Sequence, residues 1–224
     1  MGPGSRPLRA IVTRPPEQAG ALAERLERLG LEVVLCPLIE LEPVGPTEVD
    51  VTGYDWVVVT SPRGAHELAE RGRGELPRLA AIGPGTAAAL REHGIEPYLV
   101  PRVSTQEGLV AELPPDHGRV LFAGAEDARP YLARALGADM VVLYRTRELR
   151  PKEPPAGDLV VLASASAARA FAALGLDIPA VSIGPETTRE AEARGVRVVA
   201  EAESHDLDGL VAATGQAARR VAVR

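Results

Sequence analysis

Two copies of one pattern lie in this sequence, and an internal repeat restricts the possible folds more than any single motif does. DWVVVTSPRGAHELAERG, from Asp55, aligns with DLVVLASASAARAFAALG, from Asp158. AAIGPGTAAALREHG, from Ala80, aligns with VSIGPETTREAEARG, from Val181. The two blocks follow one another in the same order in both copies, which predicts two similar domains.

The repeat continues beyond these blocks. STQEGLVA, from Ser104, aligns with SHDLDGLVA, from Ser204. The copies span residues 8–116 and 118–213, almost all of the 224 residues. Each copy of about 100 residues is long enough to bury a hydrophobic core of its own.

Short apolar runs alternate with amphipathic stretches in each copy. The runs AIVT, WVVVT, LAAIG, VLFAG, LVVLA and AVSIG end in small or turn-forming residues, as strands do when both faces of a parallel sheet are buried. Between two runs, EQAGALAERLERLG keeps Leu22, Leu26 and Leu29 about one helical turn apart. The expected helix ends are marked by Gly30, Gly72, Gly94 and Gly195. This alternation predicts an α/β fold.

Two matching segments follow a strand directly and do not fit a helix. VVLCPLIELEP, from Val33, aligns with VVLYRTRELRP, from Val141, and turn-forming residues follow both. We interpret residues 36–43 and 144–151 as extended linkers that could pair antiparallel. Such pairing requires the chain to leave one domain, build the second, and return.

Composition excludes several classes of protein. Lys and Arg number 25 against 31 Asp and Glu, a formal net charge of −6, which argues against binding nucleic acid through its phosphates. Cys36 is the one cysteine and cannot form an internal disulfide, which favours a reducing compartment. No apolar run approaches the roughly 20 residues that span a bilayer, and MGPGSRP at the start has no apolar signal core. We expect a cytoplasmic protein with no nucleic-acid or membrane partner.

Six loops are the candidate binding positions, because ligands of parallel sheets bind beyond the carboxyl ends of the strands, at helix N-termini. Small, hydroxylated and glycine residues there would let carboxylate or phosphate oxygens approach the backbone. The loops are Thr13-Arg14, Thr60-Ser61-Pro62-Arg63, Gly83-Pro84-Gly85-Thr86, Ala123-Gly124, Ala163-Ser164-Ala165-Ser166 and Gly184-Pro185-Glu186-Thr187. For any one loop, an N-cap or a plain turn is an equally good interpretation.

Other kinds of site are not indicated. The chain's histidines are scattered, with no short-spaced pair, at His66, His93, His117 and His205. We therefore expect exposed histidines and no metal site. Neighbours in sequence, such as Ser204 to Asp206, do not form a catalytic triad. Cys36 is expected to be a small buried side chain, and no nucleotide-binding motif is present, so no cofactor is expected.

The repeat symmetry breaks at Tyr144, which stands where the first copy has Cys36. A phenol at a hinge between domains could donate a proton or a hydrogen bond to a leaving group. A tyrosine that only lines a core or a cleft wall fits the sequence equally well.

One set of motifs, in this order, is distinctive: TRP at Thr13, Pro37, DWVVVTSPRG from Asp55, IGPGTAAAL from Ile82, STQEGL from Ser104, VLYRT from Val142, LASASAARAF from Leu162 and IGPETTREA from Ile183. Together they resemble the uroporphyrinogen-III synthase family over nearly the whole chain. The order and spacing carry this resemblance, since each motif alone is short.

The resemblance implies two similar three-layer α/β domains with parallel sheets. A two-stranded linker joins them, and the active site lies in the cleft between the domains. The implied domains are residues 1–35 with 152–224 and residues 44–143, with linker strands at 36–43 and 144–151.

The resemblance also implies a lyase of porphyrin and haem biosynthesis. Members of the family cyclise hydroxymethylbilane, a linear tetrapyrrole with eight carboxylates, to uroporphyrinogen III with loss of water and inversion of ring D. No cofactor is needed, and a monomer is expected. Such an enzyme mainly has to hold a flexible polycarboxylate in one geometry, and backbone N–H groups at helix N-termini suit this task in a protein of charge −6.

Carried over by position, the resemblance makes Tyr144 the residue that assists departure of the hydroxyl group. It places the substrate-binding residues at Thr13, Arg14, Thr60, Ser61, Arg63, Gly83, Thr86, Ser164, Ser166, Gly184 and Thr187. The copies differ at two positions: Ala163 replaces the hydroxyl of Thr60, and Glu186 puts a carboxylate in a loop expected to face an anion.

Two alternatives stay open at this point. One is a non-catalytic tetrapyrrole-binding or regulatory protein on the same fold, which only the chemistry of the site can distinguish from the enzyme. The other is a periplasmic-type two-domain binding protein, against which the lack of a signal sequence counts. Tyr144 and the two IGP loops favour the enzyme.

Overall fold

The computed structural model describes residues 6–221, which form two units. Unit 1 runs to Glu40 and resumes at Arg147, while unit 2 consists of Leu41–Thr146. Most of the MGPGSRP segment and the last three residues of the chain lie outside the described residues. No helix in the described part is both long and apolar enough to cross a membrane.

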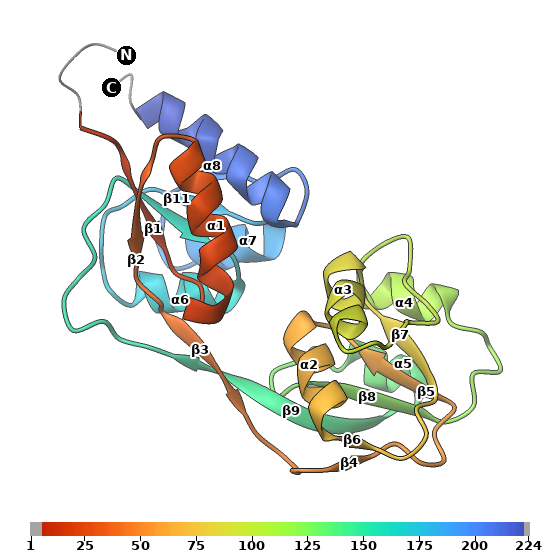
Figure 1. Cartoon of the computed structure of the whole chain (residues 1–224). Helices are drawn as coiled ribbons and strands as arrows, with labels where there is room; N and C mark the ends of the chain where they lie inside the picture. The colour runs from red at the N-terminus through yellow and green to blue at the C-terminus, as the bar shows by residue number, and fades with distance from the viewer. Residues whose placement is uncertain (1–5, 222–224) are drawn as a thin grey trace. The chain divides into compact units, whose positions relative to one another are not determined.

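Unit 1 contains a parallel sheet with the strand order β12-β11-β10-β1-β2 (Figure 1). Its strands are β1 (Arg9–Val12), β2 (Glu32–Leu35), β10 (Leu159–Leu162), β11 (Ala180–Ser182) and β12 (Val198–Glu201). The strand β2 pairs with one edge of β1, and β10, which follows unit 2 in the sequence, pairs with the other edge. The loops after β1 and β10 therefore lie at the point where the strand order reverses, which is the usual ligand position in open α/β sheets.

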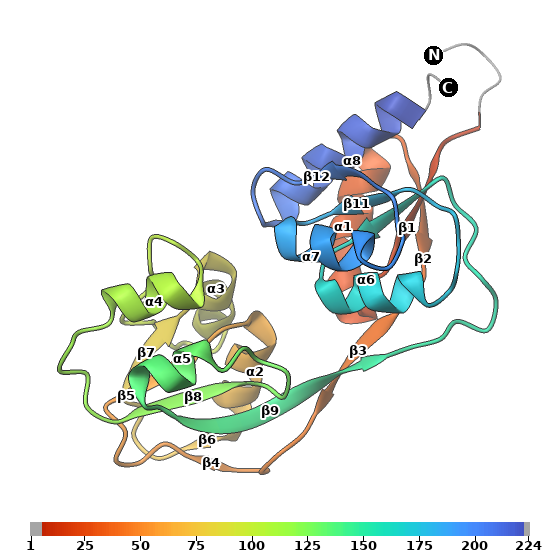
Figure 2. The ribbon, with the colours of Figure 1, turned by 180° about the vertical axis from the view of Figure 1, so that it is seen from behind.

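Helices cover both faces of this sheet, as Figure 2 shows. They are α1 (Pro16–Arg28), α6 (Ala165–Ala172), α7 (Pro185–Glu192) and α8 (Leu207–Val221). Alternate residues of β10 explain the layers, because successive side chains of a strand point to opposite faces. Leu159 and Val161 pack with α1 and α8, while Val160 and Leu162 pack with α6 and α7.

Unit 2 has the same layered construction. Its larger sheet has the order β3-β9-β8-β5-β7, and the pairs among β9, β8, β5 and β7 are parallel. The strands are β3 (Ile39–Pro43), β5 (Trp56–Val59), β7 (Arg78–Ala81), β8 (Val120–Ala125) and β9 (Asp139–Glu148). Here the order reverses between β5 and β8, so the loop after β5 lies at the switch point.

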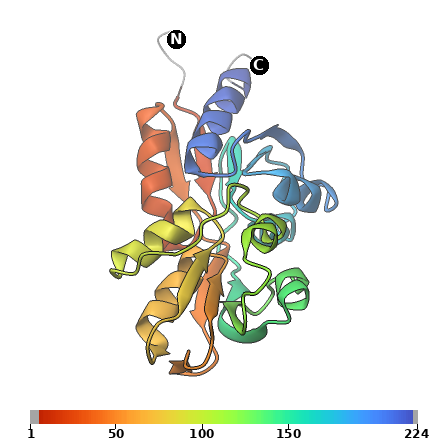
Figure 3. The same cartoon turned by 90° about the vertical axis from the view of Figure 1, so that its right-hand side faces the viewer.

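The helices of unit 2 are α2 (Pro62–Arg71), α3 (Pro84–Glu92), α4 (Gln106–Glu112) and α5 (Tyr131–Leu136). Figure 3 shows α2 on one side of the unit's strands and α5 on the other. Val57 and Val59 of β5 face α2 and α3, whereas Trp56 and Val58 face α4 and α5. The continuous apolar runs of the sequence correspond to such doubly covered strands, which confirms the α/β class.

The strands β3 and β9 carry the chain between the units. Val44 N–H donates to the Leu143 carbonyl at 2.9 Å, and Leu149 N–H donates to the Leu38 carbonyl at 2.8 Å. Partner numbers rise along one strand as they fall along the other, so the two strands run antiparallel. Ion pairs of Glu40 with Arg147 and of Glu42 with Arg145 follow the same register.

Some structural detail differs from the sequence predictions. Ala123-Gly124, interpreted as a loop, lies inside β8, because the strand continues to Ala125. Within the turn-rich segment after Pro43, Val49–Asp50 forms the short strand β4, which pairs with β6 (Gly72–Arg73). Gly72 is the C-cap of α2, as predicted, and its extended backbone begins β6.

Candidate active site

A serine and a tyrosine of unit 2 form the centre of the candidate site. Ser61 is the N-cap of α2, where its Oγ accepts a hydrogen bond from the Gly64 N–H at 3.0 Å. The same Oγ lies 2.8 Å from the hydroxyl of Tyr144. Tyr144 belongs to β9 and pairs with Ala125 just after an irregularity in the pairing of β8 with β9. The structure thus joins two predicted site residues that are far apart in the sequence.

One of the two O–H groups of the Ser61–Tyr144 pair is not used in the hydrogen bond between them. Either hydroxyl can donate within the pair, and the acceptor then keeps its own O–H. The Gly64 N–H donates to Ser61 and uses neither hydroxyl proton, so the pair still presents one hydroxyl donor. A ligand atom that accepts a hydrogen bond is the natural partner for this donor.

Tyr144 stays protonated in this environment. Only 7% of the residue is exposed. Burial raises the pKa of the Tyr144 phenol, and the Asp127 carboxylate adds to the rise, while the Ser61 hydrogen bond and the Arg63 charge oppose it. A phenol with a raised pKa acts as a hydrogen-bond or proton donor at neutral pH and not as a base.

A buried ion network on α2 lies next to this pair. Glu67, 5% exposed, receives Arg63 on Oε1 at 2.5 Å and Arg71 on Oε2 at 2.6 Å. Arg71 also donates to the backbone carbonyls of Val44 and Leu143. Sequence reasoning selected Arg63 and missed Glu67 and Arg71, although their spacing of four residues along one helix was a usable signal.

The second predicted loop of unit 2 is packed against the STQEGL segment. Gly83 is the N-cap of α3, and a Cβ there would lie 2.6 Å from the Ser104 Oγ. Thr86, in the first turn of α3, is 3% exposed. Close packing therefore explains the glycine, and the backbone N–H groups of this turn are what the loop can offer a ligand.

In unit 1 the corresponding positions have similar geometry. Ser164 is the N-cap of α6, accepting from the Ala167 N–H at 3.1 Å, and its Oγ lies 3.1 Å from that of Ser166. Gly184 is the N-cap of α7, and a Cβ there would meet the His205 ring at 2.8 Å. Thr187, like its counterpart in α3, is buried.

Thr13 and Arg14 follow β1 at the switch point of unit 1. The Thr13 side chain is fully buried and donates to the Val161 carbonyl at 3.0 Å, so its hydroxyl is already used. Arg14 donates to the Gln18 side chain at 3.2 Å, and no carboxylate within residues 6–221 pairs with it. Burial lowers the pKa of Arg14. A partly buried cation without a counter-ion is suited to bind an anion.

Each unit thus contains six of the predicted site residues: six binding residues in unit 1, and five binding residues with the proposed catalytic Tyr144 in unit 2. Thr60 is partly buried and lies between β5 and the N-cap of α2. The unit 1 group consists of Thr13, Arg14, Ser164, Ser166, Gly184 and Thr187, and the unit 2 group of Thr60, Ser61, Arg63, Gly83, Thr86 and Tyr144. Each group follows the carboxyl ends of strands in the sheet of its own unit or, for Tyr144, contacts such a loop.

Predictions outside this site had mixed outcomes. The histidines are scattered in sequence, but the packing of α2 on α3 brings His66 Nδ1 within 2.8 Å of His93 Nε2, a contact that the sequence did not indicate. Cys36 is buried, as predicted, and burial raises the pKa of its thiol. Within residues 6–221, no group of three or more His, Cys, Asp or Glu side chains could hold a metal ion.

Asp206 serves as a helix cap. It accepts from the Gly209 N–H at 2.8 Å and from the Ser204 hydroxyl at 2.9 Å, at the start of α8. These hydrogen bonds are those of a capping motif, in which a side-chain oxygen satisfies a free N–H of the first turn.

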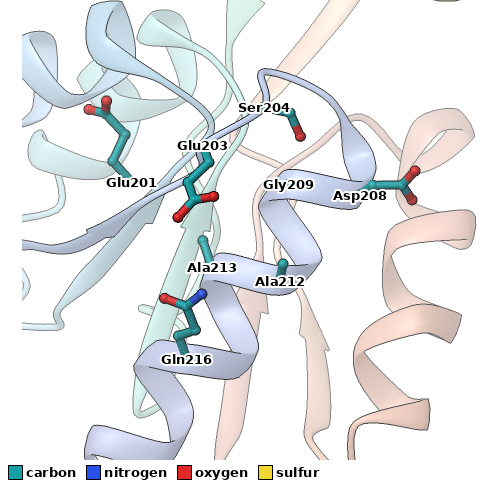
Figure 4. Close-up of a pocket in the computed structure, with 8 residues that line it drawn as sticks. All are labelled: Glu201, Glu203, Ser204, Asp208, Gly209, Ala212, Ala213 and Gln216. Atoms are coloured by element: carbon teal, nitrogen blue, oxygen red, sulfur yellow. The ribbon is translucent and has the colours of Figure 1, made fainter.

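A pocket in unit 1 lies beside the start of α8, as shown in Figure 4. It is lined by Glu201, Glu203, Ser204, Asp208, Gly209, Ala212, Ala213 and Gln216. In Figure 4 the side chains of Glu201 and Asp208 point to opposite sides, and they bond with Thr188 and Arg25 respectively. This acidic hollow is poorly suited to a polycarboxylate, because like charges repel.

Comparisons with known proteins agree on one family. The sequence model of "Uroporphyrinogen-III synthase HemD" matches residues 20–212. The chain is 26% identical over 251 residues to uroporphyrinogen-III synthase of Synechococcus elongatus, covering 94% of this chain and 95% of that protein. It is 29% identical over 236 residues to the porphyrin biosynthesis protein HemD of Ruminiclostridium josui, covering 90% of this chain and 47% of that protein, so it spans about half of that relative.

The fold has a close counterpart among solved structures. The crystal structure of uroporphyrinogen-III synthetase from Helicobacter pylori covers 97% of this chain and all of the other, with a TM-score of 0.66 at 17% identity. This likeness supports the fold, while the sequence match assigns the family. The chain therefore belongs to the uroporphyrinogen-III synthase family.

Proposed function

We propose that this protein is a uroporphyrinogen-III synthase, a lyase of tetrapyrrole biosynthesis. Its substrate is hydroxymethylbilane, and its product is uroporphyrinogen III, formed with loss of water and inversion of ring D. The family match supports the reaction, and the Ser61–Tyr144 hydroxyl pair at the start of α2 is the observation that best supports this chain as its catalyst.

The first chemical step is departure of the terminal hydroxyl group. The C–O bond of the hydroxymethyl group breaks as the pyrrole nitrogen supplies electrons, and the oxygen leaves as water after gaining a proton. The pyrrole N–H proton is lost, so the product of this step is a neutral azafulvene. The hydroxyl pair supplies a hydrogen bond to the departing oxygen, because Tyr144 is protonated and the pair has one free O–H.

The second task is to direct the new electrophilic carbon to the substituted carbon of ring D. Attack there gives a spiro intermediate, whose opening and reclosure inverts the ring. This step depends on the orientation of the reacting groups more than on acid–base chemistry. Holding reacting groups in one geometry can lower the activation free energy of a reaction substantially.

Carboxylate binding is the means of orientation in this proposal. The helices α2, α3, α6 and α7 each begin directly after a strand, with free N–H groups and a positive dipole end. Arg14 and Arg63 add one guanidinium from each unit. In the proposal, residues of both units bind the same substrate molecule. The attraction of these N–H groups and arginines for its carboxylates outweighs the repulsion from the net charge of −6.

The test replaces Tyr144→Phe and measures conversion of freshly made hydroxymethylbilane. Loss of one hydrogen bond to the departing oxygen should lower kcat about ten- to a hundredfold. Tyr131→Phe is the matched control, since Tyr131 is an exposed tyrosine of the same unit and should leave kcat unchanged. Equal rates for the two variants would contradict the role of Tyr144.

The remaining expectations stay predictions. They are a cytoplasmic location, a monomeric state and independence from any cofactor. Nothing in the comparisons favours a non-catalytic tetrapyrrole-binding protein over the enzyme.

A further inference from the structure

The two arginines that share Glu67 differ in what else they bind. Arg71 donates through Nη1 to the carbonyls of Val44, at 2.7 Å, and Pro46, at 3.2 Å, and through Nη2 to the carbonyl of Leu143 and to Glu67. For Arg63, the bond from Nη2 to Glu67 is the one polar contact found within residues 6–221. Several contacts thus fix the position of the Arg71 guanidinium, whereas the position of the Arg63 guanidinium depends on its bond to Glu67.

Charge is distributed unevenly across this network. Two guanidinium groups and one carboxylate leave one positive charge in excess. Arg71 is 13% exposed at its side chain and lies among backbone carbonyls, while Arg63 is 27% exposed. The accessible positive charge is therefore that of Arg63, in the first turn of α2 beside the N-cap Ser61.

We propose that Glu67 is a positioning residue, which holds the Arg63 guanidinium beside the Ser61–Tyr144 pair so that Arg63 can bind a carboxylate of the substrate. One oxygen of Glu67 fixes Arg63, and the other joins it to Arg71, which is bonded to the residue preceding Tyr144. The proposal rests on the proposed function, because it specifies how one carboxylate contact of that reaction is built.

Two further observations relate Arg63 to the Ser61–Tyr144 pair: the backbone of the next residue lies close to both side chains, and the charge of Arg63 acts on the phenol. A Cβ at Gly64, next to Arg63 in α2, would lie 3.1 Å from the Ser61 Oγ and 3.9 Å from Tyr144 Cε1. The charge of Arg63 also opposes the rise that burial causes in the pKa of Tyr144. Displacement of Arg63 should therefore be visible in the titration of Tyr144, even without substrate.

The experiment is a double-mutant cycle on Glu67→Gln and Arg63→Gln, with KM and kcat measured for hydroxymethylbilane. Because an ion-assisted contact to a carboxylate is lost, each single variant should raise KM about tenfold with a smaller effect on kcat. The double variant should be no worse than Arg63→Gln alone, since Glu67 acts through Arg63. Glu70→Gln, an exposed carboxylate on the same helix, should leave both constants unchanged.

The pKa of Tyr144 is measured by ultraviolet titration, as the difference between a protein with Tyr144 and the same protein with Tyr144→Phe. This measurement distinguishes a positioning role of Glu67 from a role in maintaining the fold. If Glu67 positions Arg63, Glu67→Gln raises the pKa of Tyr144 further. If Glu67 only maintains the fold, the loosened site becomes hydrated and the pKa of Tyr144 falls towards its ordinary value, which would overturn the proposal.

Additive effects in the cycle would overturn it as well. If Glu67→Gln alone does not fold, the KM of Arg63→Gln is compared with that of the double variant. In the double variant Arg71 is the one guanidinium left in the network. A higher KM for the double variant than for Arg63→Gln would refute the proposal. If the parent protein makes no type III isomer, the proposed function fails, and the titration still tests the link from Glu67 to Arg63.

Discussion

At the residue scale, Ser61 combines two tasks that are usually separate. Its Oγ caps α2 by accepting from Gly64 and also contacts the Tyr144 hydroxyl. An N-cap contributes about 1 kcal/mol to stability, so the position is well fixed before any ligand arrives. The hydroxyl pair proposed as catalytic is therefore preorganised by an ordinary feature of helix formation.

Tyr144 gives a pH prediction whose sign follows from its environment. Burial raises the pKa of Tyr144 in the folded protein above the value of about 10 expected in the unfolded chain. Its contribution to stability is complete below the unfolded pKa and is lost as the pH rises through the folded pKa. In urea titrations above about pH 10, the free energy of unfolding of the parent should fall more steeply than that of Tyr144→Phe. Parallel curves would contradict the raised pKa.

At the element scale, the two IGP loops show how the repeat is used. Gly83 and Gly184 have extended backbones that any residue can adopt, so conformational freedom is not why glycine is required. Instead, Ser104 and His205, from corresponding segments of the two copies, lie where a Cβ would be. Each loop is thereby held against the next segment of its own unit.

Gly83→Ala tests this packing. The added methyl group would lie 2.6 Å from the Ser104 Oγ, and relieving the clash should cost about 1–3 kcal/mol of unfolding free energy. Gly85→Ala is the control, because a Cβ there meets only Pro62 at 3.9 Å and should change stability little. Chemical denaturation measures both, and equal stability of the two variants would disprove the explanation.

The sequence predicted the elements with strong patterns and missed those made by contacts. Runs such as WVVVT were readable because β5 is buried on both faces. The pairing of β4 with β6 involves two residues on each side, too few for a periodic signal. At the site, Ser61 and Tyr144 were each predictable, but their contact depends on strand order, and the His66–His93 contact depends on helix packing.

At the scale of the whole molecule, the proposed function requires an acidic protein to bind a substrate with many carboxylates. The net charge of −6 repels such a ligand at long range, but this effect is screened within about 10 Å at ordinary ionic strength. Local donors then decide the binding. Arg14 and Arg63 are suited to this because neither is fully neutralised by a carboxylate of its own among the described residues.

Arg14→Gln should separate binding from stability. Removing a partly buried cation that lacks a carboxylate partner within residues 6–221 should leave the melting temperature unchanged or raise it, because a desolvation cost disappears. The KM should rise about tenfold through loss of one charge-assisted contact. Arg28→Gln, an exposed position in the last turn of α1, is the control. A large loss of stability with an unchanged KM would contradict this role.

The most direct test of the account is the isomer formed by the parent protein. Hydroxymethylbilane is supplied to an excess of protein, the product is oxidised, and type I and type III uroporphyrins are separated by chromatography. Predominantly type III is expected, since only a held substrate undergoes inversion of ring D. Type I alone, as formed in buffer without protein, would contradict it and identify the protein as a binder on this fold.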